Sequence, residues 1–132
     1  MSWWRGFPDA WREATTGAEP PEIVMNDFVK WCEQFSDPIF VSHPLSYDFN
    51  MVAWYLLQYY GRNIFQTPAM MNALDLPSYV SGKFGLELSR SYRNQLPDEL
   101  KQGLPEHSHS ALDDAQGLAV LLKNIFTQPA CM

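Results

Sequence analysis

The pattern of apolar and polar residues predicts a chain of several helices and two short buried strands. Apolar residues recur at helical spacing within residues 7–14, from Pro21 to about Phe35, and from about Ser110 to Phe126. The runs 39–42 and 71–76 are short and apolar, which is typical of buried strands. Together with two further helices, this order indicates an α/β layered fold with parallel strands.

The two further helices are expected between the strands and after the second one. From Phe49 to Tyr60 apolar residues occupy nearly every side, which predicts a helix that packs on several faces and ends at Gly61. Pro77 suits the first turn of a helix that ends at Gly85. Residues 86–108 are expected to be largely irregular.

Two of the helices have a predicted buried face. Helix 21–35 is expected to bury an apolar stripe of Ile23, Phe28, Trp31 and Phe35. At about 100° per residue, the last helix is expected to bury Ala111, Ala115, Leu118, Ala119, Leu122 and Ile125.

Length and composition narrow the class of protein. The 132 residues suffice for one domain, residues 1–132, and 46% hydrophobic with 18% charged residues indicate a globular chain. No apolar run is long enough to cross a bilayer, and the N-terminal residues lack the pattern of a secretory signal. Cys32 and Cys131 lie far apart without a C-x-x-C pattern, so neither a disulfide framework nor a zinc knuckle is indicated. We expect a cytoplasmic protein without membrane contact.

The net charge of −6 argues against a non-specific nucleic-acid coat, which would need a strong basic patch. It does not argue against a nuclease, because carboxylates that bind divalent cations make a chain acidic while the ions face the phosphate. Four basic residues fall in one segment, which is either a substrate-facing loop or an ordinary solvated surface: Lys83, Arg90, Arg93 and Lys101.

The predicted sheet is too small to be stable alone. Two short strands do not form an independent sheet, and their outer edges would lack hydrogen-bond partners. Either partner strands come from elsewhere, or the chain lacks an N-terminal segment of its fold. Exposed strand edges are expected to drive self-association or poor solubility.

Two adjacent aspartates lie in the first turn of the predicted last helix. Ser110 and Asp113 are expected to form an S-x-x-D capping pair, which gives Asp113 a role at the start of the helix. Asp114 projects at the border of the apolar face, where a carboxylate needs a cation or a hydrogen-bond donor beside it. A metal ion would meet this need, and so would an arginine or a backbone N–H group.

Asp48 occupies a similar position at the start of a buried helix shortly after a strand. An ordinary role as helix N-cap would explain it. Two such carboxylates near element ends of an α/β fold also favour a shared metal site, because hard cations require converging oxygen ligands.

Two motifs resemble those of a known family. His109-x-Ala111-x-x-Asp114 resembles the third motif of the DEDDh, or DnaQ-like, 3′–5′ exonucleases, and "HPLSYD", residues 43–48, resembles their second motif. The resemblance covers roughly residues 36–126 and is closest to the small bacterial and phage 3′–5′ exoribonuclease-like branch. The "SWW…FPDAW" segment near the N-terminus also resembles that branch.

The resemblance implies an RNase H-like fold and a phosphodiesterase with two Mg²⁺ or Mn²⁺ ions that acts on the 3′ end of single-stranded nucleic acid, with RNA favoured over DNA. By position, Asp48 and Asp114 are metal ligands, and His109 is the general base that activates the attacking water. His107 matches no motif position, and His43 lies outside the catalytic set.

One departure from the family pattern is serious. The first motif of the family, Asp-x-Glu on the first strand, supplies the other two carboxylates, and no Asp-x-Glu occurs in this sequence. We therefore interpret the chain as an N-terminally truncated form of the exonuclease fold whose metal site is incomplete. Two alternatives remain open: a catalytically inactive nucleic-acid or protein-binding module, and a small zinc protein that uses His107, His109 and a cysteine.

Overall fold

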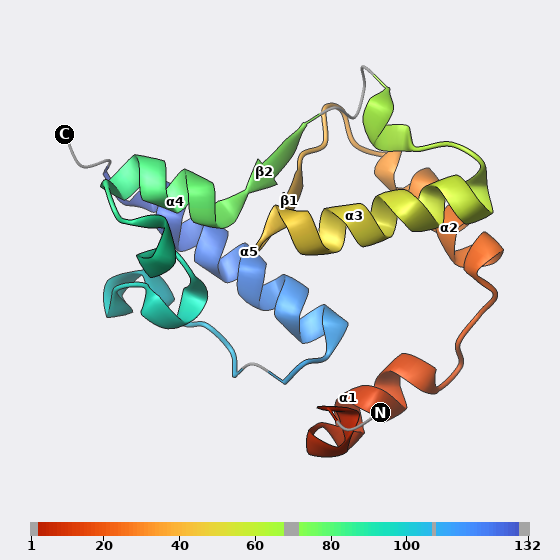
Figure 1. Cartoon of the computed structure of the whole chain (residues 1–132), viewed down its shortest axis with the longest axis horizontal. Coiled ribbons are helices and arrows are strands. Elements are labelled where there is room, and N and C mark those ends of the chain that lie inside the picture. Colours follow the sequence, from red (N-terminus) through yellow and green to blue (C-terminus); the bar gives the residue numbers. More distant parts are fainter. Residues whose placement is uncertain (1–2, 68–71, 107, 130–132) are drawn as a thin grey trace. The chain divides into compact units, whose positions relative to one another are not determined.

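The computed structural model describes residues 3–67, 72–106 and 108–129. Within them the chain is mixed α/β and mostly helical, with five α-helices and two parallel strands (Figure 1). The bounds in chain order are α1 Pro8–Thr15, α2 Pro21–Cys32, β1 Phe40–Ser42, α3 Leu45–Tyr55, β2 Ala73–Asp75, α4 Leu76–Phe84 and α5 Ala111–Thr127. Among these residues, no helix combines the length and the apolar character needed to cross a membrane.

The chain divides into two compact units. Unit 1 joins residues 1–18 to residues 80–132, and unit 2 comprises residues 19–79. Each unit has its own buried side chains and is described by itself.

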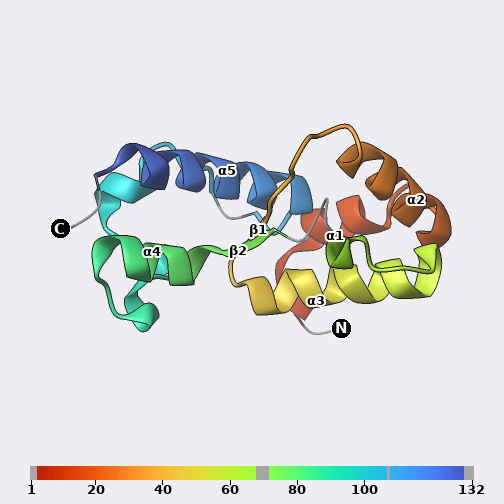
Figure 2. The same cartoon turned by 90° about the horizontal axis from the view of Figure 1, so that it is seen from above.

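In unit 2, the two strands pair in parallel, with Phe40 opposite Ala73 and Ser42 opposite Asp75. Their carboxyl ends therefore lie together, and α3 begins directly after β1 (Figure 1). The core of the unit lies where α2 meets the end of α3 (Figure 2), and it contains Val29, Cys32, Leu56 and Ile64. The parallel arrangement of the two strands is confirmed.

The predicted buried stripe of α2 is wrong. Val29 and Cys32 are buried and Phe28 packs against the same cluster, whereas Ile23 and Trp31 are exposed. The helix ends at Cys32, so Phe35 lies beyond it and is also exposed. The predicted stripe included Phe35, which is not part of the helix, and this moved the predicted buried face away from Val29 and Cys32.

The helix after β1 is longer than its apolar pattern predicts, and it is less buried. It begins at Leu45, continues as a π-helical turn over Leu56–Tyr60, and ends at Gly61, whose φ of 85° needs the left-handed region that glycine tolerates. The predicted end is confirmed. The expected packing on several faces is wrong, because no residue from Leu45 to Tyr55 is buried and Leu56 is the buried residue of the π-helical turn.

In unit 1, α5 buries Gly117, Leu121 and Ile125, whereas Ala111, Ala115 and Ala119 are exposed. The predicted buried face of the last helix, which included these alanines, is therefore wrong. Ile125 belongs both to the predicted face and to the observed one. Gly117 explains the difference, because a Cβ on it would lie 3.3 Å from Nη1 of Arg93 and 3.4 Å from Cγ of Pro105. A position without a side chain allows the loop before α5 to pack closely on the helix.

The segment before α5 is irregular, as predicted, and contains three short 3₁₀ turns, at Leu88–Arg90, Arg93–Gln95 and Asp98–Lys101. Asn124 of α5 holds this segment by two hydrogen bonds. The side-chain amide of Asn124 donates to the carbonyl oxygen of Leu100, at 3.0 Å, and to that of Gln102, at 2.8 Å. Unit 1 thus uses polar side chains of α5 to hold a loop that has little regular structure of its own.

Candidate functional site

The first predicted site residue, Asp48, lies in the first turn of α3. Its Oδ2 accepts a hydrogen bond of 2.5 Å from the hydroxyl group of Ser42, the buried last residue of β1. The alternative role of Asp48 as helix N-cap is wrong, because the N-cap position is Pro44 and no side-chain hydrogen bond caps this helix. Asp48 is instead an exposed residue that is oriented by a hydroxyl group at the end of the strand.

A second carboxylate at the same sheet end, Asp75, is not predicted as a site residue. One of its oxygens accepts from the backbone N–H of Leu45, at 2.8 Å, and the other accepts from the backbone N–H of Ser78, at 3.0 Å, and from the Ser78 hydroxyl group. Asp75 therefore caps α4 and also binds the first residue of α3. An aspartate followed by Leu-Pro-Ser is a recognisable helix start, and this signal identifies the capping role.

The environment of Asp75 lowers its pKa. Partial burial acts to raise the pKa, but the hydrogen bonds from Leu45 and Ser78, helped by the charge of His43, more than offset it. Both oxygens of Asp75 are used within the protein. We therefore assign this carboxylate a structural role at the strand ends and leave Asp48 as the candidate ligand in unit 2.

The predicted base, His109, lies in unit 1 just before α5 and has a left-handed φ of 63°. Its ring packs edge-on against Phe7, with ring centres 4.0 Å apart, and against Trp3, with ring centres 4.9 Å apart. His109 thus contacts the aromatic residues of the N-terminal segment. This contact orients the imidazole, and it also gives His109 a role in packing.

The two adjacent aspartates of α5 are both half-buried, and they differ in their contacts. Oδ2 of Asp113 accepts a hydrogen bond of 2.7 Å from the Ser108 hydroxyl group. The expected capping pair of Ser110 and Asp113 is wrong, because the N-cap Ser110 makes no side-chain capping bond. Oδ1 of Asp114 is buried, and Asp114 lies one turn before Gly117 on the buried face of the helix.

Three of the four basic residues between positions 83 and 101 have contacts within unit 1. Lys83 donates to the carbonyl oxygen of Ile125, at 2.8 Å, and Arg93 donates to that of Pro105, also at 2.8 Å. Lys101 pairs with Asp98 at 2.8 Å. These contacts favour the interpretation as structural and surface residues, and Arg90 is exposed.

The described residues do not form a complete metal centre. Asp48 belongs to unit 2, and His109 and Asp114 belong to unit 1. Within residues 3–67, 72–106 and 108–129, no three His, Cys, Asp or Glu side chains form a group that could hold a metal ion. Asp48 and Asp114 supply only two carboxylates, which does not fit a centre of two Mg²⁺ or Mn²⁺ ions.

Of the residues considered for zinc, the structure describes His109 and Cys32. His107 and Cys131 lie outside the described residues. Cys32 is buried in the core of unit 2, and its burial, followed by the charge of Glu33, raises the pKa of the thiol. A thiol with a raised pKa is a poor metal ligand, because the thiolate is the form that binds.

The chain matches no protein-family model, no curated protein and no solved structure. The family resemblance therefore depends on the motifs themselves and on the elements that carry them.

Proposed function

We propose that this chain is a 3′–5′ exonuclease-like protein of the RNase H-like fold that acts on the 3′ end of single-stranded nucleic acid, RNA in preference to DNA, with an incomplete active site. The observation that carries the proposal is the position of the third motif. It places His109 just before α5 and a partly buried carboxylate, Asp114, in the first turn of that helix. Asp48, held by Ser42 at the end of β1, is the corresponding carboxylate of unit 2.

The proposed roles follow the motif positions. His109 would accept a proton from the attacking water, and Asp48 and Asp114 would each supply an oxygen ligand for Mg²⁺ or Mn²⁺ in a completed site. Because two carboxylates do not complete a two-ion site, the chain alone is expected to degrade nucleic acid weakly or not at all. Robust Mn²⁺-dependent release of mononucleotides by rigorously purified protein would contradict this expectation.

The test compares the two adjacent aspartates by calorimetric titration with Mn²⁺. Asp114→Asn should abolish metal binding at the site, because it replaces the motif carboxylate. Asp113→Asn is the matched control and should leave metal affinity nearly unchanged, at a cost of about 0.3–1 kcal/mol of stability. Equal losses of affinity, or a larger loss for Asp113→Asn, would show that the motif assignment is wrong.

The base is tested separately, in any form of the protein that shows activity. His109→Ala should lower turnover by about 10²–10⁴-fold while metal affinity stays nearly constant. If metal binding falls as much as turnover, His109 is a ligand and the base assignment fails.

The second candidate function is a catalytically inactive module that binds nucleic acid or protein. The packing of His109 against Phe7 and Trp3 favours it, since an imidazole can be retained for its aromatic contacts alone. An oligonucleotide that binds the chain equally well with and without Mn²⁺, and is never shortened, would favour this module over the exonuclease.

A further inference from the structure

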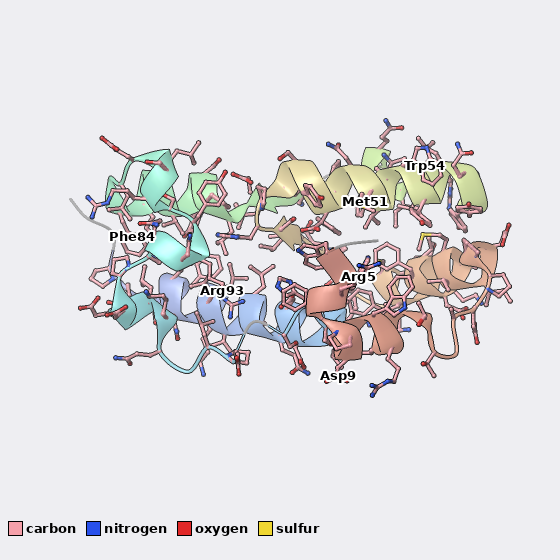
Figure 3. All side chains as sticks on the ribbon, turned by 60° about the horizontal axis from the view of Figure 1, so that its bottom comes forward. Arg5, Asp9, Met51, Trp54, Phe84 and Arg93 are labelled. Atoms are coloured by element: carbon pink, nitrogen blue, oxygen red, sulfur yellow. The ribbon has the colours of Figure 1, made fainter. Side chains whose placement is uncertain are left out.

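An apolar row lies exposed along α3 in unit 2. Tyr47, Met51 and Trp54 are spaced by four and then three residues, so they lie on one side of the helix. Their exposed fractions are 70%, 55% and 51%, and that of Leu57, in the π-helical turn that continues the helix, is 50%. We call these four residues the α3 row; Figure 3 labels Met51 and Trp54.

The α3 row has the spacing with which one helix packs on another. Apolar residues at intervals of four and three form the seam that a second helix covers in coiled coils and bundles. A helix that is apolar on most sides is normally covered, yet α3 has no buried residue. A contiguous exposed apolar patch rimmed by polar residues is a common mark of an interaction surface.

The charges around the α3 row select the partner. Residues 38–82 contain only three charged side chains other than histidine, one positive and two negative: Arg62, Asp48 and Asp75. Asp48 lies near the start of the row and Arg62 lies beyond its end, where the guanidinium group packs over the ring of Tyr60 at 5.5 Å. Midway between positions 48 and 62 lies Tyr55, next to Trp54.

We infer that the α3 row is the docking surface for a second copy of this chain, with the two α3 helices antiparallel about a two-fold axis near Trp54. This arrangement places Asp48 of each copy beside Arg62 of the other and covers each row with its equivalent. A parallel pair would instead place the two copies of Asp48 together, which is unfavourable. Antiparallel helices also bring opposite ends of their dipoles together.

The size of the row predicts a weak dimer. Four side chains that are each about half exposed offer on the order of 400 Å² per copy, about half the roughly 800 Å² per partner of a standard stable interface. Association should therefore depend strongly on concentration. Association through the α3 row should stop at the dimer, whereas non-specific aggregation would continue to larger species.

Sedimentation velocity tests the inference from about 1 μM to about 1 mM, the range of dissociation constants expected for so small an interface. The wild-type chain should pass from monomer to dimer within this range. Met51→Lys should remain a monomer throughout, because it places a charge in the middle of the row. Val24→Lys is the matched control, since Val24 is an exposed apolar residue on another helix of the same unit, and it should dimerise as the wild type does.

A charge exchange tests the antiparallel arrangement. Arg62→Glu should weaken the dimer by setting a second negative charge against Asp48 of the other copy, and Asp48→Lys with Arg62→Glu in the same chain should restore it. Circular dichroism confirms that each variant remains folded, which matters for Asp48 because Ser42 donates to it. A double variant that does not recover, although folded, overturns the antiparallel arrangement.

Other outcomes overturn the docking surface itself. A wild-type chain that stays monomeric over the whole range would mean that a different partner or another part of the same chain covers the α3 row. Dimers that persist in Met51→Lys but disappear in Ile39→Lys, just before β1, would assign association to the strand edge. If Met51→Lys and Val24→Lys weaken dimer formation equally, the added charge acts through general solubility and not through the α3 row.

Discussion

The helices α3 and α5 use apolar residues in opposite ways. In α5, apolar positions on one side are buried, while Asn124 donates to two loop carbonyl groups. In α3, apolar residues occur nearly all round, and the residues from Leu45 to Tyr55 include none that is buried. The comparison shows that neighbouring segments, rather than the apolar content of a helix, decide how much of it is buried.

The largest expected effect separates two adjacent leucines of the π-helical turn that follows α3. Leu56 is fully buried in the core of unit 2, so Leu56→Ala should lower the free energy of unfolding by about 2–5 kcal/mol through lost burial and a cavity. Leu57 is half exposed, so Leu57→Ala should cost less than about 1 kcal/mol. Urea unfolding followed by circular dichroism measures both, in dilute protein so that association does not contribute. Similar losses of stability in the two variants would mean that Leu56 and Leu57 are buried to the same extent.

A smaller effect concerns the carboxylate that connects α3 to the strand ends. Asp75→Asn removes a charged acceptor of hydrogen bonds from Leu45 and Ser78 and should cost about 1–2 kcal/mol at pH 7. The pKa of Asp75 is lowered in the folded state, so its stabilising contribution is present above the unfolded aspartate pKa of about 3.9 and is lost as pH falls through the folded value.

The same variant therefore predicts a difference in pH dependence. From about pH 5 downward, the wild-type chain should lose stability more steeply than Asp75→Asn. Urea unfolding at a series of pH values measures both slopes. Parallel curves would show that the Asp75 carboxylate contributes nothing specific to the fold.

The smallest effect concerns the C-terminal end of α5. Lys83 donates to the carbonyl oxygen of Ile125, where a positive charge also favours the negative end of the helix dipole. Lys83→Met should cost about 1 kcal/mol. Lys123→Met, on the exposed side of the same helix, is the control and should change stability by less than about 0.5 kcal/mol. Thermal unfolding of the two variants side by side tests the difference.

Part of the candidate site could be predicted from the sequence. The sequence predicted that His109 lies at the start of the last helix and that Asp114 lies in its first turn. In the structure α5 begins at Ala111, which agrees with this prediction. The position of Asp48 after a strand was also predicted, because "IFVS" has the apolar character of a buried strand. Asp75 was missed as a neighbour of that strand end, since the parallel pairing of Ser42 with Asp75, 33 positions further along the chain, is not visible in a local pattern.

By itself, the sequence determined where most elements begin and end. Proline at the start of α2 and glycine at the end of the π-helical turn act through backbone geometry that depends on neighbouring residues alone. Tertiary structure decided which faces are buried. Gly117 is buried because Arg93 and Pro105 pack onto it, and Trp54 is exposed because no described residue covers that side of α3 enough to bury it. Burial depends on contacts between segments distant in the chain, and a helical period shows only which residues share a face, not which face a neighbour will cover.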